Sequence, residues 1–387
     1  MTAQLEVELC QSLAGIDPQH WDALGEADYP FTRHAFLNAL EQHHCLLEYG
    51  WQAVYILLYR QQRLIAAAPC YIKSNSYGEL VFDHSWAQAY QQSGRPYYPK
   101  LVTAIPYTPA TGPRLLVHRD IIDAAEVIAL QSQLIRVIKQ FCRTHDLSGW
   151  HLLFEREATS KALQQEQLVY RYDCQYHWHN HNYQCFDDFL AALSSRKRKN
   201  IRKERASVAN EDITIERRYG DQLSTQEWQR VHQLYAGIFD RKYGTPTLSA
   251  GFFEAVGNAL KQQVMVVLAR RDQHIVAISL FFSSDSTLYG RLWGCDEFYN
   301  HLHFECCYYQ GIEHCIEQGL QHFDPGAQGE HKISRGFLPT RTCSAHWLVD
   351  SDFQQMVQRF LQQEEKYIND YCLELGKRSP YRNEEAK

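Results

Sequence analysis

The sequence predicts an α/β protein of two similar domains, each a central mixed sheet flanked by helices. Its 387 residues exceed what one hydrophobic core usually fills. In both halves, segments whose apolar residues recur at helical spacing come before apolar runs that resemble strands. The order of these segments is the same in the two halves. Parts of the first half also recur in the second at a nearly constant offset, which indicates an internal duplication.

The first half begins with a strand, helices and a hairpin. Residues 5–9 alternate apolar and acidic side chains as a half-buried strand does, and a helix is expected over 33–44. Strands are expected over 51–59 and 64–72 around the polar turn RQQR, with a third over 79–82. The later elements expected are a helix at 124–144, a strand at 150–155, a short helix at 160–166 and a strand at 169–178.

The second half repeats this order. An offset of 210 residues aligns the two hairpins, with Val54 on Val264, Ile56 on Val266, Leu58 on Leu268 and Arg60 on Arg270. At an offset of 216, Pro30 aligns with Pro246 and Phe36 with Phe252. The later elements expected are a helix at 304–317, strands at 321–323 and 343–349, and a closing helix at 353–375.

Composition narrows the class of protein. The net charge of -6 does not suggest a general polyanion binder. Twelve cysteines without a CxxC pair suit a reducing cytosol. The first residues lack the basic and apolar segments of a signal peptide, and the strongest apolar runs are about as long as a strand. We therefore expect a cytoplasmic protein without stable membrane insertion.

The strongest candidate for a functional loop is QHFDPGAQGEHKISRGFLPT, from Gln321 to Thr340. Its glycines and prolines alternate with hydrogen-bonding groups of both charge signs, and loops that carry chemistry combine such groups with backbone freedom. A solvated turn with Asp324 as a helix cap is the structural alternative. The candidate site residues in this stretch are Gln328, Glu330, His331, Lys332 and Arg335.

A strongly basic segment, SSRKRKNIRKERA from Ser194 to Ala206, joins the halves. With the preceding FDDFLAAL it is expected to form one helix over about 186–208, on which Arg198, Arg202 and Arg205 share a side. Such a helix suits a phosphate-bearing partner such as RNA, although ion pairs with the acidic remainder explain its charges equally well. The domains expected are 1–185, this connecting helix at 186–209, and 210–387.

A histidine-rich segment, DCQYHWHNHNYQC, precedes the basic one. Strand geometry directs alternate histidines to one face, where two of them could share a metal ion. A substrate groove lined by Gln175 and His177 is favoured over a metal site, and packing explains the segment about as well. We expect no metal and assign substrate contacts to Gln175, His177 and Trp178.

A second reactive cluster is HLHFECC, from His301. Glu305 falls in the first turn of an expected helix, where the helix dipole favours its charge, and this alone explains it. The same carboxylate could act as a general base, with His303 as the alternative. Asp296, just past Gly294, is a further substrate-binding candidate.

Several common motifs are absent from the sequence. There is no GxGxxG, GxxxxGK[ST], HExxH or GxSxG, which disfavours nucleotide hydrolysis, Rossmann cofactor binding and zinc proteolysis. No glycine-rich loop precedes the helices expected near Ala124 or Phe304, where the pyrophosphate of coenzyme A would need backbone amides. This absence disfavours simple acetyl transfer.

Three runs resemble a bacterial family: HWHNHNYQCFDDFLAALSSRKRKNIRKERA, RLWGC with HLHFECCYYQGIE, and FDPGAQGEHKISRGFLPTRTCSAHW. The chain is similar over nearly its whole length to the FemAB-like predicted N-acyltransferases, often described as peptidoglycan biosynthesis or recognition proteins. The resemblance implies tandem GNAT-like acyltransferase domains, each with a mainly antiparallel sheet. In the broader family, Fem-type transferases move an amino acid from aminoacyl-tRNA onto a peptidoglycan precursor.

We therefore expect an acyl- or aminoacyltransferase in which a substrate amine attacks an activated ester or thioester. The donor would be aminoacyl-tRNA or acyl-coenzyme A, and the acceptor a small-molecule or peptide amine such as a cell-wall precursor, with no resident cofactor. The roles expected are charge stabilisation or phosphate binding by Lys332 and Arg335, proton transfer by Glu305 or His303, and donor-phosphate binding by Arg198, Arg202 and Arg205.

Two other classes of protein fit the same residues. A non-catalytic module could bind peptidoglycan peptide or RNA through an aromatic groove, and would show saturation without turnover. A metal-dependent hydrolase is the third option, which metal analysis of the purified protein would test.

Overall fold

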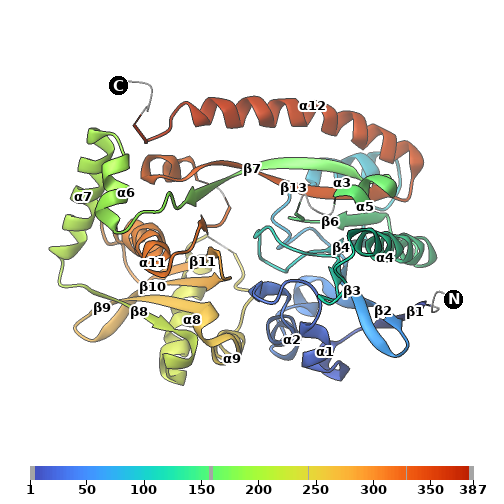
Figure 1. Ribbon diagram of the computed structural model, residues 1–387, viewed down its shortest axis with the longest axis horizontal. Helices are drawn as coiled ribbons and strands as arrows, with labels where there is room; N and C mark the ends of the chain where they lie inside the picture. Colours follow the sequence, from blue (N-terminus) through green and yellow to red (C-terminus); the bar gives the residue numbers. More distant parts are fainter. Residues whose placement is uncertain (1–4, 157–159, 243, 328, 383–387) are drawn as a thin grey trace. The chain divides into compact units, whose positions relative to one another are not determined.

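Buried apolar side chains form two large cores, one of residues 54–168 with Ala345 and Trp347, and one of residues 176–337 with Leu375. The computed structural model describes residues 5–156, 160–242, 244–327 and 329–382 (Figure 1). The chain divides into unit 1, Met1–Asp173 with Arg341–Asp370, and unit 2, Cys174–Thr340 with Tyr371–Lys387.

Unit 1 is a mixed, mainly antiparallel sheet with helices on both faces. Its elements are β1 (Leu5–Cys10), η1 (Leu13–Gly15), α1 (Pro18–Asp22), η2 (Pro30–Thr32), α2 (His34–Gln42), η3 (Leu47–Tyr49), β2 (Trp51–Arg60), β3 (Arg63–Lys73), α3 (His84–Gln92), β4 (Lys100–Thr103), β5 (Leu116–Val117), α4 (Ala124–Thr144), β6 (Gly149–Leu152) and α5 (Ser160–Gln165), with parts of β7 (Val169–His179), β13 (Leu338–Leu348) and α12 (Ser351–Gly376). The strand order is β1-β2-β3-β4-β6-β13-β7, and β4 runs parallel to β6. The apolar face of α4 packs on one side of β2 and β3, while α1 and α2 lie on the other (Figure 1).

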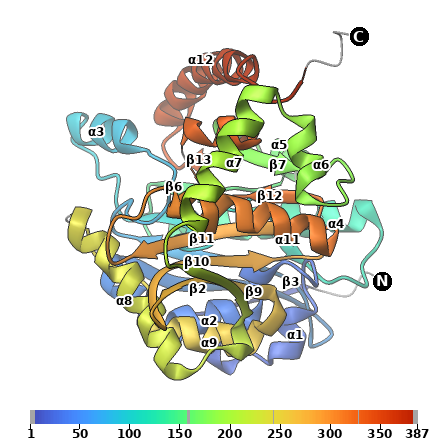
Figure 2. The same ribbon diagram turned by 90° about the vertical axis from the view of Figure 1, so that its left-hand side faces the viewer.

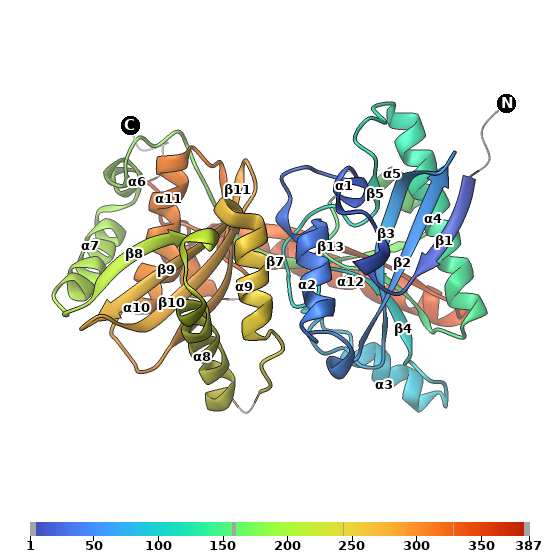
Figure 3. The ribbon, with the colours of Figure 1, turned by 90° about the horizontal axis from the view of Figure 1, so that it is seen from below.

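Unit 2 has the same kind of sheet. Its elements are α6 (Phe186–Ala192), α7 (Ser195–Ala209), β8 (Thr214–Tyr219), η5 (Gly220–Gln222), α8 (Thr225–Lys242), α9 (Ala250–Leu260), η6 (Lys261–Gln263), β9 (Val264–Arg271), β10 (His274–Ser283), β11 (Thr287–Cys295), α10 (Leu302–Phe304), the π-helical turn η7 (Glu305–Tyr309), α11 (Gln310–Gln318), β12 (His322–Asp324) and η8 (Glu330–Arg335). The strand order is β7-β12-β11-β10-β9-β8. Figure 2 shows α11 on one face of this sheet and α8 and α9 on the other, and Figure 3 shows α8 and α9 side by side.

The two units contain hairpins with the same turn. Gln61 and Gln62 join β2 to β3 with φ of 51° and 62°, and Asp272 and Gln273 join β9 to β10 with φ of 47° and 67°. Two consecutive left-handed residues make the turn that matches the right-handed twist of paired strands. The predicted strand, helix and hairpin order is present in both units, and the predicted fold class is confirmed.

The last strand of each repeat pairs in the other unit. β7 closes the first repeat, but its segment from Cys174 pairs with β12, where Trp178 faces Phe323. β13 closes the second repeat, but its segment from Arg341 pairs with β6, where Ala345 faces Leu152. The units therefore differ from the predicted ranges 1–185 and 210–387, because both terminal strands cross over.

Two helices replace the single basic helix predicted over 186–209. α6 and α7 are separated by Leu193 and Ser194 (Figure 2). The backbone of Leu193 is extended and its side chain is fully buried, so the helix breaks where this residue enters the core. Ile201 and Val208 of α7 also pack in that core. The basic segment is therefore an integral part of unit 2 and does not form a separate linker.

Charged side chains are buried in unit 1 beneath the segment between β3 and α3. Lys73 and Lys100 face each other across β3 and β4, and both are fully buried. The ammonium group of Lys100 donates to Glu79 Oε2 at 2.7 Å and also to Asp83. The predicted strand at 79–82 is wrong: the segment is irregular because Glu79 and Asp83 turn inward to this ammonium group.

Candidate active site

Two strands of unit 2 diverge and leave a cavity between them. β11 pairs in parallel with β12 only over Thr287–Tyr289 and His322–Asp324. β11 then continues to Cys295, while the other strand ends at Asp324 and the chain turns at Gly326, whose φ is 85°. A cavity of about 240 Å³ lies at this divergence. Its walls include Arg291, Trp293, His303, Cys307, Tyr308, His331 and Lys332.

A β-bulge shapes one wall of the cavity. Leu292 pairs with Leu280 and Gly290 with Phe281, so Arg291 is the extra residue of β11. Bulges re-aim side chains and are common beside active sites. Arg291 was not among the predicted site residues. A one-residue insertion into a strand ladder leaves no periodic signal, so only its position within RLWGC could have suggested it.

Lys332 lies at the edge of the cavity inside the predicted glycine-rich loop. The side chain is 3% exposed, and its Nζ donates to Gly326 O at 2.6 Å and to the carbonyl oxygens of Pro325 and Ala327 at 3.4 Å. Burial lowers the pKa of Lys332 to about 8, against the attraction of Asp324. The loop therefore wraps three carbonyl groups around a cation that remains charged at neutral pH.

Two histidines join Lys332 at the cavity. His331 Nε2 lies 2.9 Å from the hydroxyl group of Tyr308. The ring of His303 is 6.3 Å from that of His331 and packs edge-on against Trp293 at 5.2 Å. Partial burial and the charges of Arg335 and Lys332 lower the pKa of His331. A neutral imidazole, able to accept a proton, thus stands beside the cation.

Glu305 and Arg335, two of the predicted catalytic residues, are held by α7. Arg205 donates to both carboxylate oxygens of Glu305 at 3.0 and 3.1 Å. Arg335 donates to both oxygens of Glu204 at 2.7 and 3.2 Å, and its guanidinium group lies 3.4 Å from the ring centre of Phe304. Neither Glu305 nor Arg335 lines the cavity as the described residues define it.

Replacing Arg205 with alanine is expected to lower the free energy of unfolding of unit 2 by about 1–3 kcal/mol, because the buried carboxylate of Glu305 loses its cation. Urea unfolding followed by fluorescence measures this change. Arg202→Ala on the same helix is the matched control, because its ion pair with Asp187 is exposed. Equal effects of the two substitutions would contradict an anchoring role for Arg205.

The predicted groove residues of β7 are not gathered at the cavity. Trp178 is fully buried and packs against Phe189. His177 Nε2 lies 3.1 Å from Gln175 Oε1 and 3.7 Å from Asp324 Oδ1, behind the turn that holds Lys332. Burial lowers the pKa of His177. These side chains support the loop and do not form an open groove among the described residues.

The remaining predicted contacts lie elsewhere in unit 2. Asp296 pairs with Arg230 at 3.0 Å, and Glu330 accepts from Tyr371 and Arg378 at 2.9 and 2.8 Å. Gln328 lies outside the described residues. Within the described ranges, no group of three or more His, Cys, Asp or Glu side chains is placed to hold a metal ion.

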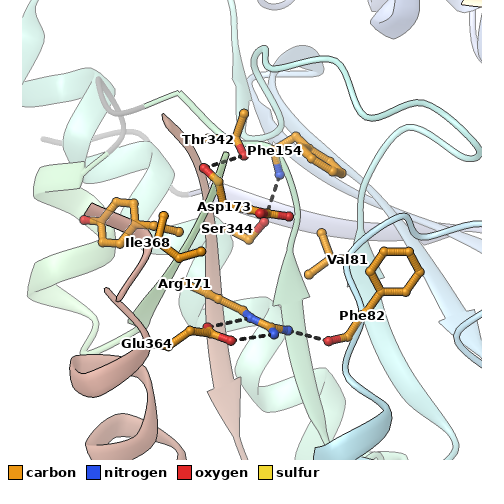
Figure 4. Close-up of a pocket in the computed structure, with 10 residues that line it drawn as sticks. Val81, Phe82, Phe154, Arg171, Asp173, Thr342, Ser344, Glu364 and Ile368 are labelled. Carbon is orange, nitrogen blue, oxygen red and sulfur yellow. Dashed lines mark hydrogen bonds and ion pairs between the residues drawn. The ribbon is translucent and has the colours of Figure 1, made fainter. Parts of the chain in front are cut away.

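In unit 1 the corresponding divergence, beyond β4 and β6, is occupied by the chain itself. Gly112 donates to Phe154 O, and the fully buried Arg114 donates to Leu153 O and Ala110 O at 3.1 and 2.7 Å. A separate, smaller cavity of about 90 Å³ lies beside Arg171 (Figure 4). Arg171 spans Glu364 and Phe82 O there, and none of the predicted site residues lines it.

Each unit is thus a mainly antiparallel α/β unit, and unit 2 has a polar cavity where two of its strands diverge. The chain belongs to the FemAB-like family of peptidoglycan biosynthesis/recognition proteins, whose profile matches residues 12–383. The resemblance found in the sequence is therefore confirmed. None of the curated proteins matches the sequence.

Two solved structures share this fold. The C-terminal domain of a lysylphosphatidylglycerol synthetase candidate from Agrobacterium fabrum is 9% identical with a TM-score of 0.54, covering 88% of this chain and 93% of that one. FemX is 11% identical with a TM-score of 0.52, covering 91% of this chain and all of its own. No helix in the described ranges combines the length and apolarity of a bilayer-crossing segment.

Proposed function

We propose that the protein is an N-acyl- or aminoacyltransferase that moves a group from an activated donor to an amine, with the cavity of unit 2 as its reaction site. Family membership supports a transferase in peptidoglycan synthesis. The observation that carries the proposal is the convergence of Lys332, His331 and His303 on one cavity. The acceptor would be the amine of a cell-wall precursor, met in the cytoplasm.

The reaction needs a positive charge beside the carbonyl that is attacked. When the amine adds to an ester or thioester carbon, negative charge develops on the carbonyl oxygen, and a preorganised cation stabilises it strongly in a water-poor site. Lys332 supplies this charge, because the loop carbonyls fix its ammonium group at the edge of the cavity. We therefore assign Lys332 the charge-stabilising role that the sequence analysis expected for it.

The reaction also needs a group that takes the proton from the attacking amine. His331 is our candidate, because its lowered pKa keeps the imidazole neutral at pH 7 and Tyr308 fixes one ring nitrogen. His303 is the second candidate. We assign Glu305 a structural role instead: its carboxylate anchors α7, since Arg205 already donates to both of its oxygens.

The exposed face of α7 is our candidate for the donor's phosphates. Arg205 is engaged with Glu305 and Glu313, whereas Arg202 pairs with Asp187 and both of these side chains are exposed. Phosphate contacts supply much of the affinity of a protein for RNA. The side chains assigned to this role are Arg196, Arg198, Lys199, Arg202 and Lys203.

The decisive experiment presents the purified chain with labelled aminoacyl-tRNA or acyl-coenzyme A and a panel of amine acceptors. Covalent transfer of the label to an amine, detected by mass spectrometry, is the expected result. Saturable binding of a donor or acceptor without turnover, under conditions that support a control transferase, would show a binding module instead. Unlabelled coenzyme A and deacylated tRNA serve as the controls.

The rate of transfer is expected to fall above pH 8. Lys332 loses its charge as the pH rises through its pKa of about 8, so kcat/KM should drop about tenfold per further pH unit. An acceptor amine of pKa below 6 is used, because its neutral fraction is then nearly constant over the range measured. A rate that is level between pH 7 and pH 9.5 would contradict a cationic role for Lys332.

A further inference from the structure

The turn after β12 is bound at both backbone polar groups of one residue, Gly326. Its N–H donates to Asp324 Oδ1 at 2.8 Å, and its carbonyl oxygen accepts from Lys332 Nζ at 2.6 Å. A carboxylate that accepts from the N–H two residues further along closes an Asx-turn. The φ of 85° at Gly326 is in the left-handed region that favours glycine. Asp324 therefore shapes the turn whose carbonyl group holds Lys332.

Asp324 is itself buried, with 4% of its surface exposed. Among the described residues, the one basic side chain in direct contact with its carboxylate is His177, whose Nε2 lies 3.7 Å from Oδ1. Burial lowers the pKa of His177, so this imidazole is neutral at pH 7 and gives the carboxylate no counter-charge. A buried carboxylate is costly without a compensating cation. The ammonium group of Lys332, held on the same turn, supplies that cation.

The other titratable side chains around Lys332 do not replace this carboxylate. Besides His177, they are the ones that share the cavity walls with the lysine: Arg291 on β11, His303 on α10, Cys307 and Tyr308 on η7, and His331 on η8. Burial raises the pKa of Cys307 to about 12 and that of Tyr308 above its usual range, so neither is an anion at pH 7. Among the described residues, Asp324 is thus the carboxylate whose attraction acts on Lys332.

We propose that Asp324 is a positioning residue of the unit 2 site, which holds Lys332 in place through the turn at Gly326 and keeps its ammonium group protonated. The inference rests on the proposed function, since Lys332 is the cation assigned to the reaction. Asp324 does not line the cavity as the described residues define it, and it acts through the lysine alone. Without its charge, Lys332 would be a neutral amine over more of the working pH range and would stabilise the carbonyl oxygen less.

Asp324→Asn tests the charge, because it removes the carboxylate but keeps an oxygen that accepts from Gly326 N. The pH at which Lys332 loses its proton is followed by NMR on protein containing lysine with carbon-13 at the ε position. The Lys332 signal is identified by its absence in Lys332→Met. Its titration midpoint should lie at about pH 8 in the wild type, and about one pH unit or more lower in Asp324→Asn.

Glu317→Gln is the matched control for the charge. It removes an exposed carboxylate of α11 that pairs with Arg217, and it should leave the Lys332 midpoint unchanged. Equal midpoints in Asp324→Asn and the wild type would overturn the proposal. If Asp324→Asn does not fold, Asp324→Glu and Asp324→Gln are compared instead, because they have the same length and differ in charge. The midpoint must then be lower in Asp324→Gln.

Asp324→Glu tests the turn. The longer side chain keeps the charge but does not fit the Asx-turn at Gly326, so the carbonyl group that holds Lys332 is displaced. The Lys332 midpoint should stay near that of the wild type, while kcat for transfer should fall about tenfold or more. A wild-type kcat in Asp324→Glu, or a midpoint as low as in Asp324→Asn, would overturn the proposal.

The pH dependence of transfer gives a measurement that a merely structural role would not change. Removing the attraction of Asp324 lowers the pKa of Lys332, so the cation is lost at lower pH. In Asp324→Asn, kcat/KM should therefore begin to fall about one pH unit below the wild type. A lower rate with an unshifted profile would overturn the proposal. The NMR midpoint needs no turnover, so it decides the role of Asp324 even if no transfer is found and the proposed function fails.

Discussion

Lys332→Met is expected to lower kcat/KM for transfer about 100- to 1000-fold, the range seen when one preorganised oxyanion-stabilising group is removed. Methionine keeps the length of the side chain but cannot carry the charge that the loop carbonyls hold at the cavity. Initial rates with the donor and acceptor identified in the transfer assay measure the loss. Most of it should appear in kcat, because the charge acts chiefly in the transition state.

The control for this substitution is Lys377→Met, which removes an exposed lysine paired with Glu374. It should leave the rate unchanged. Because Lys332 is buried, the thermal midpoint of each variant is also measured, and activity is compared only below both midpoints. A folded Lys332→Met protein with wild-type kcat would show that Lys332 has no catalytic role. The proposed site would then lack its charge-stabilising cation.

Lys100→Met is expected to lower the free energy of unfolding of unit 1 by about 3–5 kcal/mol, the cost of removing one partner of a buried ion pair. Lys100 is fully buried, and both Glu79 and Asp83 depend on its ammonium group. Without it, two carboxylates remain in the interior with no cation in direct contact. Urea unfolding monitored by fluorescence measures the change, and the transition assigned to unit 1 should move to lower urea.

Arg63→Met is the matched control, since its ion pair with Asp120 is exposed on the same sheet and should contribute nothing measurable to stability.

The dependence of the unfolding free energy on pH provides a second measurement. Burial raises the pKa of Asp83, but the attraction of Lys100 outweighs this effect and holds that pKa well below its usual value. The stability from this pair is therefore present above about pH 4 and lost as the pH falls further. Equal stability of Lys100→Met and wild type would contradict this account.

Features set by local chemistry could be predicted from the sequence. The hairpins were predicted because their apolar runs end at a polar turn, and the repeat offset located the second copy. The glycine-rich loop was predicted because Gly329 and Gly336, with φ of 109° and 101°, must bend the chain beside Lys332. His331 and Lys332 line the cavity for this reason, whereas His303 reaches it from α10.

Features set by long-range contacts could not be predicted. The sequence does not show that Arg205 turns toward Glu305 and removes it from the cavity, because the two lie 100 positions apart. The bulge at Arg291 and the inward turn of Glu79 also depend on partners chosen in the folded chain. A basic run and an acidic residue look the same in sequence whether they bind a ligand or each other.

The crossing of β7 and β13 has a consequence for how the chain is made. The strand that pairs with β6 is Leu338–Leu348, so a nascent polypeptide cannot complete the first unit until the whole second repeat up to this strand has been translated. A gene cut at the midpoint would encode two fragments that each lack a strand of their own sheet. Although the sequence reads as a duplication, neither copy is self-sufficient.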